Sequence, residues 1–257
     1  VAPLRMSSIC LIKRAICSAD GFGDDNGTIT ASHYDNDEDH WLPALHLRYQ
    51  LTNDTLVRSA FTRSVVRPTF EQLSPGFEID GSEASFGNPA LKSLESNNLD
   101  LGIEHYMGRA GVVSAFAFYK DIKNPIEEVQ YSTASFVFET TFINSPKAEL
   151  YGAELEYRTN FSMPISNAWF DAREWLFSAN YTYTSSEVQA NDGDQVFDPI
   201  SRSRRDAALF GLDGSDLQGT PQNILNMQFG WESDVDQLTL LLGWVDDRIL
   251  QRGFGGG

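Results

Sequence analysis

The sequence lacks a long apolar run. No segment holds about 20 consecutive apolar residues, the length that a membrane-spanning helix needs. Its most apolar stretch, Leu238 to Val245, has the length of a strand. Only a closed β-barrel could carry such a chain across a membrane, because a barrel satisfies every backbone polar group within the protein. Val1 is not an initiator residue and no signal peptide follows it, so we expect an internal piece or a mature segment rather than a complete gene product.

Positive charge is scarce. The 257 residues include 19 Lys and Arg against 36 Asp and Glu, which gives a net charge of −17. A nucleic-acid partner is therefore not expected, because binding a phosphate backbone requires clustered Lys and Arg. The excess of carboxylates indicates a surface that faces water on at least one side.

Cysteine is also rare, with only Cys10 and Cys17 present. A disulfide between them is possible in an oxidising compartment. A zinc site is only weakly supported, because no histidine pair lies nearby. We favour two incidental thiols. Residues 1–40 receive no role and are expected to be an extracellular loop. They contain an acidic, histidine-bearing stretch from His33 to His40 that could bind a divalent metal, but we favour a solvated loop.

From Trp41 onward the sequence alternates between apolar and polar residues, the period of β-strands. The clearest strand runs from Trp175 to Thr184, with one apolar face and one almost wholly polar face. Two of the predicted strands, 55–65 and 112–122, have an uncertain phase. The eight predicted strands are 45–51, 55–65, 98–104, 112–122, 151–158, 175–184, 225–231 and 238–245.

The connections between these strands differ in length. Tight turns are expected near 52–54, 107–111 and 232–236, and an intermediate one at 159–174. Long loops are expected at 66–95, 127–144 and 186–222. Short turns at one end and long loops at the other are typical of an outer-membrane barrel. A soluble antiparallel sandwich also alternates, but ionisable residues on the polar faces and aromatic residues near strand ends favour the barrel.

Several segments carry a family resemblance. The most specific is Gly87-Asn88-Pro89-Ala90-Leu91-Lys92, followed by Ser96 to Glu104. The others are 63–75, 118–124, 144–157 and 219–223. In this order and spacing they resemble TonB-dependent receptors. One departure is Ser93-Leu94, where the family more usually has a proline and then an acidic residue, so we expect a changed loop conformation there.

The resemblance implies an all-β, antiparallel transmembrane barrel of 22 strands, of which residues 41–257 would supply about eight. It implies the outer membrane of a Gram-negative bacterium, contact with lipid and lipopolysaccharide, and a TonB complex that acts through N-terminal parts absent here. It also implies active uptake of an iron chelate, cobalamin or oligosaccharide, with no cofactor. The alternatives are a passive porin-like barrel and a soluble β-rich carbohydrate-binding or hydrolytic domain.

No catalytic motif is present, and no enzyme is expected. Glu154 and Glu156 lie on one face of a strand, roughly 7 Å apart. They could act as a general acid and base, but we favour charges of a barrel wall. Loop aromatics could stack on a ligand or, as we favour, pack loop against loop. The arginine cluster formed by Arg202, Arg204 and Arg205 could contact an anionic ligand or lipopolysaccharide phosphate, but we favour a solubilising loop. The ligand-binding candidates are Arg48, Glu104, Phe136, Phe138, Glu154, Glu156, Arg202, Arg204 and Arg205.

Overall fold

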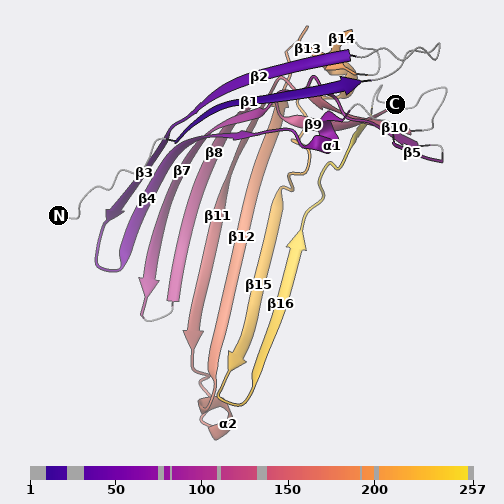
Figure 1. Ribbon diagram of the computed structural model, residues 1–257. Helices are drawn as coiled ribbons and strands as arrows, with labels where there is room; N and C mark the ends of the chain where they lie inside the picture. Colours follow the sequence, from indigo (N-terminus) through magenta and orange to yellow (C-terminus); the bar gives the residue numbers. More distant parts are fainter. Residues whose placement is uncertain are drawn as a thin grey trace.

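The computed structural model is dominated by one large antiparallel sheet (Figure 1). It describes residues 10–21, 32–74, 78–81, 83–108, 111–131, 138–191, 193–199 and 203–253. Within this part of the chain, no helix has the length and apolar character required to cross a membrane.

The large sheet contains all eight strands predicted from alternation. Its order is β16-β15-β12-β11-β8-β7-β4-β3, so strands that follow one another along this part of the chain are neighbours. The strands are β3 (Ala44–Gln50), β4 (Thr55–Val66), β7 (Leu94–Met107), β8 (Gly111–Lys123), β11 (Lys147–Phe161), β12 (Glu174–Gln189), β15 (Asn223–Glu232) and β16 (Gln237–Val245). The outermost strands β3 and β16 do not pair with each other, so the barrel is not closed in this chain.

The pairing register places most of the large apolar residues of the eight strands on one face. Leu99 of β7 lies opposite Phe61 of β4 and Tyr119 of β8, and Trp175 of β12 lies opposite Trp231 of β15. Residues directly opposite one another share a face of the sheet. Many of these apolar side chains are exposed, including Leu99, Leu155, Leu240 and Trp244. An exposed apolar band of this extent suits contact with lipid.

The phase of β4 and β8, uncertain from the sequence, follows from the same register. Phe116 and Phe118 of β8 pair with Gly102 and Gly152, and so they point to the polar face of the sheet. A Cβ atom at Gly102 would lie 2.1 Å from the Phe116 ring. The two phenylalanines therefore cover glycines on the polar wall, an arrangement known as aromatic rescue.

The long connections are more ordered than the sequence indicated (Figure 1). Five short strands from them, and from the segment after β16, pair in the order β17-β9-β10-β6-β5. The strands of this small sheet are β5 (Glu78–Asp80), β6 (Glu83–Ser85), β9 (Ile126–Tyr131), β10 (Phe138–Asn144) and β17 (Arg252–Gly253). The loop after β12 adds a hairpin and a 3-10 turn: β13 (Gln195–Asp198), β14 (Ser203–Asp206) and η1 (Ala207–Phe210). We call this assembly the loop layer.

Local chemistry explains where β4 and β8 end. Pro68 cannot donate to a ladder and lies two residues after Val66, the last residue of β4. Thr69 then caps the single turn α1 (Phe70–Leu73), since its hydroxyl accepts from the Gln72 backbone N–H at 3.2 Å. Asn124 directly follows β8 with φ of 51°, a left-handed conformation that asparagine tolerates better than most residues.

Residues 10–21 and 32–42, where no regular structure was expected, form an antiparallel hairpin. It consists of β1 (Cys10–Gly21) and β2 (Ser32–Leu42). Only Pro43 separates β2 from β3, and its carbonyl accepts from the Arg63 backbone N–H at 3.0 Å. Cys10 and Cys17 both lie in β1, so about seven strand residues, or roughly 23 Å, separate them. That spacing is incompatible with a disulfide between them.

The opposite end of the sheet carries the short connections. The β3–β4, β7–β8 and β15–β16 turns are tight, as predicted. The intermediate β11–β12 connection contains the single turn α2 (Ala168–Asp171), which lies beyond the strand ends, far from the loop layer (Figure 1).

Candidate functional site

The polar face of the sheet carries a row of charges near the short-turn end. Arg48 of β3 lies opposite Arg58 of β4. The Arg58 Nε atom lies 2.6 Å from Glu104 Oε1, and the Tyr106 hydroxyl donates to Glu104 Oε2 at 2.5 Å. Glu104 is therefore engaged within the wall, whereas Arg48 is exposed. Of these two candidates, Arg48 is better placed to meet a molecule in the lumen.

The predicted carboxylate pair lies further along the same face. Glu154 of β11 is opposite Phe116, and Glu156 is opposite Ser114. Glu154 is exposed and Glu156 is half-buried. The alternation of the sequence predicts both carboxylates on one face of a strand, and the register agrees. The position of Phe116 beside Glu154 was not predicted. The only available signal was the Phe-Ala-Phe alternation within 116–118, and its phase was ambiguous.

The loop layer has a buried core that connects it to the strands. Ile122 and Val188, near the loop ends of β8 and β12, pack in one cluster with Val129, Ile143 and Phe210. Phe210 is 1% exposed. This loop aromatic therefore packs loop against loop, the alternative that the sequence favoured.

A buried ion pair crosses this core. The Arg252 Nε atom donates to Glu127 Oε2 at 2.8 Å, and both side chains are almost fully buried. The rest of the guanidinium donates to the carbonyl oxygens of Gly211 and Asp216 and to Ser215 Oγ. Burial raises the pKa of the Glu127 carboxyl above its ordinary value, and the arginine partly offsets that effect. Arg252 thus joins β9, the β12–β15 loop and the segment after β16.

The arginines of the predicted cluster differ in their contacts. Arg205 contacts the buried Asp198 carboxylate at 3.4 Å. Arg204 is exposed, with a 3.4 Å contact to the Gln195 carbonyl. Arg202 and Phe136 lie outside the described residues, as does the side chain of Phe138.

Arg204 also lines a cavity of about 260 Å³ within the loop layer. Lys92, Asn144 and Phe197 contribute to its wall. Asn144 is committed to the fold, because its side chain bonds the backbone N–H and carbonyl of Lys92. The two cations and the aromatic ring are the groups of this cavity best suited to contact a ligand.

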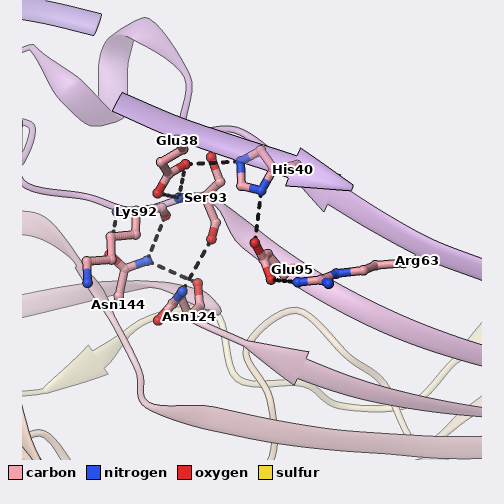
Figure 2. A network of polar contacts seen from close by, with 8 residues as sticks. All are labelled: Glu38, His40, Arg63, Lys92, Ser93, Glu95, Asn124 and Asn144. Carbon is pink, nitrogen blue, oxygen red and sulfur yellow. Dashed lines mark hydrogen bonds and ion pairs between the residues drawn. The ribbon is translucent and has the colours of Figure 1, made fainter. Parts of the chain in front are cut away.

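A polar network attaches the β1–β2 hairpin to the barrel strands (Figure 2). His40 of β2 is buried, and its Nδ1 atom lies 2.8 Å from Glu95 Oε1 of β7. Glu95 also pairs with Arg63 of β4. The Ser93 backbone N–H donates to the Glu38 carboxylate at 3.2 and 3.3 Å. A proline at position 93, as in the family pattern, has no N–H to donate.

The acidic, histidine-bearing stretch before Trp41 is therefore a strand rather than a loop. Asp39 is exposed and His40 is buried, because neighbouring side chains of a strand point to opposite faces. Among the described residues, no group of three or more His, Cys, Asp or Glu side chains could hold a metal ion.

A family model for the TonB-dependent receptor-like β-barrel matches residues 18–254. The ferric enterobactin receptor of Pseudomonas aeruginosa is 26% identical over 231 residues, which cover 81% of this chain and 26% of that protein. The iron-regulated outer membrane virulence protein of Vibrio cholerae serotype O1 is 23% identical over 214 residues, which cover 78% of this chain and 28% of that protein.

Two solved structures show the same fold. The copper transporter OprC matches with a TM-score of 0.57 and 14% identity, over 92% of this chain and 31% of that one. The siderophore receptor PirA from Pseudomonas aeruginosa matches with a TM-score of 0.51 and 18% identity, over 80% of this chain and 34% of that one. The chain thus spans about a quarter to a third of the length of these proteins.

The large eight-stranded sheet, with one exposed apolar face and ordered loops at one end, does not fit a soluble sandwich of two packed sheets. The family match extends further toward the N-terminus than the predicted boundary at residue 41, into strand β1. The chain belongs to the TonB-dependent receptor family and forms part of its outer-membrane β-barrel.

Proposed function

We propose that the chain supplies wall and loops to an active importer of a metal chelate, energised through TonB. The observation that carries this proposal is the loop layer. The β8–β11 and β12–β15 connections share one buried core directly above a polar wall, and the β4–β7 connection joins them through the pairing of β6 with β10. An ordered loop layer of this kind suits the capture of a scarce ligand. A passive pore needs only an open lumen, so the ordered loop layer favours the importer over the porin-like alternative.

An iron chelate is the best-supported ligand among the three classes that the sequence left open. Two curated relatives are a ferric enterobactin receptor and an iron-regulated outer membrane virulence protein. Cobalamin and oligosaccharides remain alternative ligand classes, which the uptake assay described below compares with the iron chelate. The plug and the TonB contact would come from other parts of the whole protein.

We place the ligand contacts in the loop cavity and along the polar wall of the lumen. Arg204 and Lys92 would attract an anionic group of the chelate, and exposed Arg48 and Glu154 would line its path through the lumen. Glu104 and Arg205 would act indirectly, since Arg58 and Asp198 engage them. The apolar face would contact outer-membrane lipid and lipopolysaccharide. No covalent step is proposed for any of these residues.

The test is uptake by cells that express the whole protein and no other receptor for the chelate. Radiolabelled ferric catecholate should accumulate in cells with TonB and not in cells without it. Labelled cobalamin and a maltodextrin serve as competing ligand classes. Uptake of the ferric chelate at equal rates with and without TonB would refute the importer.

A matched pair of variants then tests the site. R204Q should weaken chelate binding by roughly tenfold or more, because a hydrogen bond to a charged group contributes about 1.5–3 kcal/mol. R248Q removes another exposed arginine, beyond β16, and should leave binding unchanged. Equal affinities for the two variants would place the contact elsewhere.

A further inference from the structure

The β11–β12 connection folds outward onto the apolar face of the sheet. The Trp169 ring of α2 lies 5.5 Å from the Trp231 ring and 6.2 Å from the Trp175 ring, centroid to centroid. Phe170 stacks on Trp175 at 5.8 Å. The register places Trp175 and Trp231 on the apolar face together with Phe229. Trp175 is consequently only 3% exposed, although it belongs to the lipid-facing side of its strand.

Specific contacts hold this connection in place. The Asn167 side chain caps α2 by accepting from the Trp169 backbone N–H at 2.8 Å. The Arg173 guanidinium lies 3.9 Å from the Trp169 ring centroid, a cation–π contact. Arg173 also pairs with Asp236 of the β15–β16 turn. Two neighbouring short turns are thereby joined into one unit.

The unit presents apolar side chains outward. Ile165 is 49% exposed, Trp169 44% and Val235 89%. We call residues 165–173 and 233–236 the foot. Its exposed residues continue the apolar face at the end where the short turns lie.

The foot lies at the edge of the apolar band. The eight steps from Trp175 to Tyr183 span roughly 27 Å along β12, or about 20 Å along the membrane normal at the usual strand tilt. The apolar band of outer-membrane barrels is about 25 Å tall. Because α2 packs on Trp175, it reaches the level where acyl chains meet headgroups, the usual depth of tryptophan.

We propose that the foot inserts into the headgroup boundary of the periplasmic leaflet and binds its phospholipids. This inference rests on continuity with the lipid-facing wall and is independent of the imported ligand. The foot and its flanks carry exposed carboxylates at Asp171, Glu174 and Asp234. Its one arginine is paired with Asp236. Headgroups with an ammonium group, such as phosphatidylethanolamine, therefore fit better than purely anionic ones.

The test uses the whole receptor, labelled with 5-fluorotryptophan, in phosphatidylethanolamine-rich nanodiscs. The Trp169 signal is assigned from its loss in W169F, which keeps an aromatic ring on Trp175. A nitroxide near the headgroup end of the lipid chain should broaden this signal more than a water-soluble gadolinium chelate does. The reverse order would place the foot in water and overturn the proposal.

Two internal references calibrate the experiment. F70W introduces tryptophan at a 93% exposed position of α1, another single helical turn, at the loop end. That signal should respond to the gadolinium chelate. Trp244 on the apolar face of β16 should respond to lipid nitroxides. Replacing phosphatidylethanolamine with phosphatidylglycerol should reduce lipid broadening at Trp169 and not at Trp244; no change at Trp169 would contradict the headgroup preference.

Discussion

At the scale of single residues, the backbone of Ser93 distinguishes this chain from the family pattern. Its N–H donates to the Glu38 carboxylate and so contributes to the attachment of β2 to the barrel strands (Figure 2). Hydrogen bonds to charged groups contribute about 1.5–3 kcal/mol. The changed loop conformation expected from the sequence stays a prediction, and the structure shows a donor at Ser93 that proline cannot supply.

S93P should loosen the β1–β2 hairpin, because it removes that donor. Amide exchange of residues 32–42 should accelerate by roughly tenfold or more, corresponding to at least about 1.4 kcal/mol. S93A keeps the N–H and is the matched control. Equal exchange in the two variants would show that Glu38 does not hold the hairpin.

The Arg252–Glu127 pair links β9 to the segment after β16 within the loop layer. R252M would leave the buried Glu127 carboxylate unpaired, which typically costs about 3–5 kcal/mol. Amide exchange in β9 and β10 should rise accordingly. The cost should shrink as pH falls through the raised pKa of Glu127, because protonation removes the buried charge.

Two further variants isolate that charge. E127Q/R252M removes both charges and should be more stable than R252M alone. R248M, in the exposed part of the same segment, should behave like the unaltered protein. If R252M matched R248M, the loop layer would not depend on this pair.

At the scale of elements, close approach along the polar wall constrains particular glycines. A Cβ atom at Gly152 would lie 2.1 Å from the Tyr183 carbonyl oxygen and 2.5 Å from the Phe118 ring. At Gly243 of β16 the nearest atom would be Asn226 Oδ1, at 3.6 Å. The two glycines both lie in barrel strands, yet only the first is confined by its neighbours.

G152A should therefore lower the unfolding temperature of the detergent-solubilised receptor, at an overpacking cost of about 1–3 kcal/mol. G243A should be tolerated. Adding F118A to G152A should restore only part of the loss, since the Tyr183 carbonyl is backbone and cannot move aside. Equal unfolding temperatures for G152A and G243A would contradict the packing described here.

Strand prediction succeeded where alternation was uninterrupted, and β12 shows why: its apolar side chains meet lipid while its polar ones meet water. It failed for β2, whose acidic composition indicated a solvated loop although His40 is buried there. It also failed for β9, where the buried positions are Glu127 and Val129. A carboxylate partnered by an arginine 125 residues away leaves no local signal.

At the scale of the whole molecule, the two ends of the sheet differ in chemistry. One end carries the loop layer with its buried core and polar cavity. The other carries tight turns and the foot. The site candidates of the sequence divide accordingly: Arg204 and Arg205 belong to the loop layer, whereas Arg48 and Glu104 line the wall toward the turns. Sequence alone could not place them, because the register that aligns the strands is tertiary information.

The large sheet should span the outer membrane with the loop layer on the outside of the cell. The most direct measurement is labelling of single cysteines in the whole protein, with Cys10 and Cys17 changed to serine, by a maleimide that cannot cross the membrane. E71C, in α1, should be labelled in intact cells, and N53C, in the β3–β4 turn, only after the outer membrane is permeabilised. Labelling of N53C in intact cells, or protection of E71C, would contradict this orientation of the barrel wall.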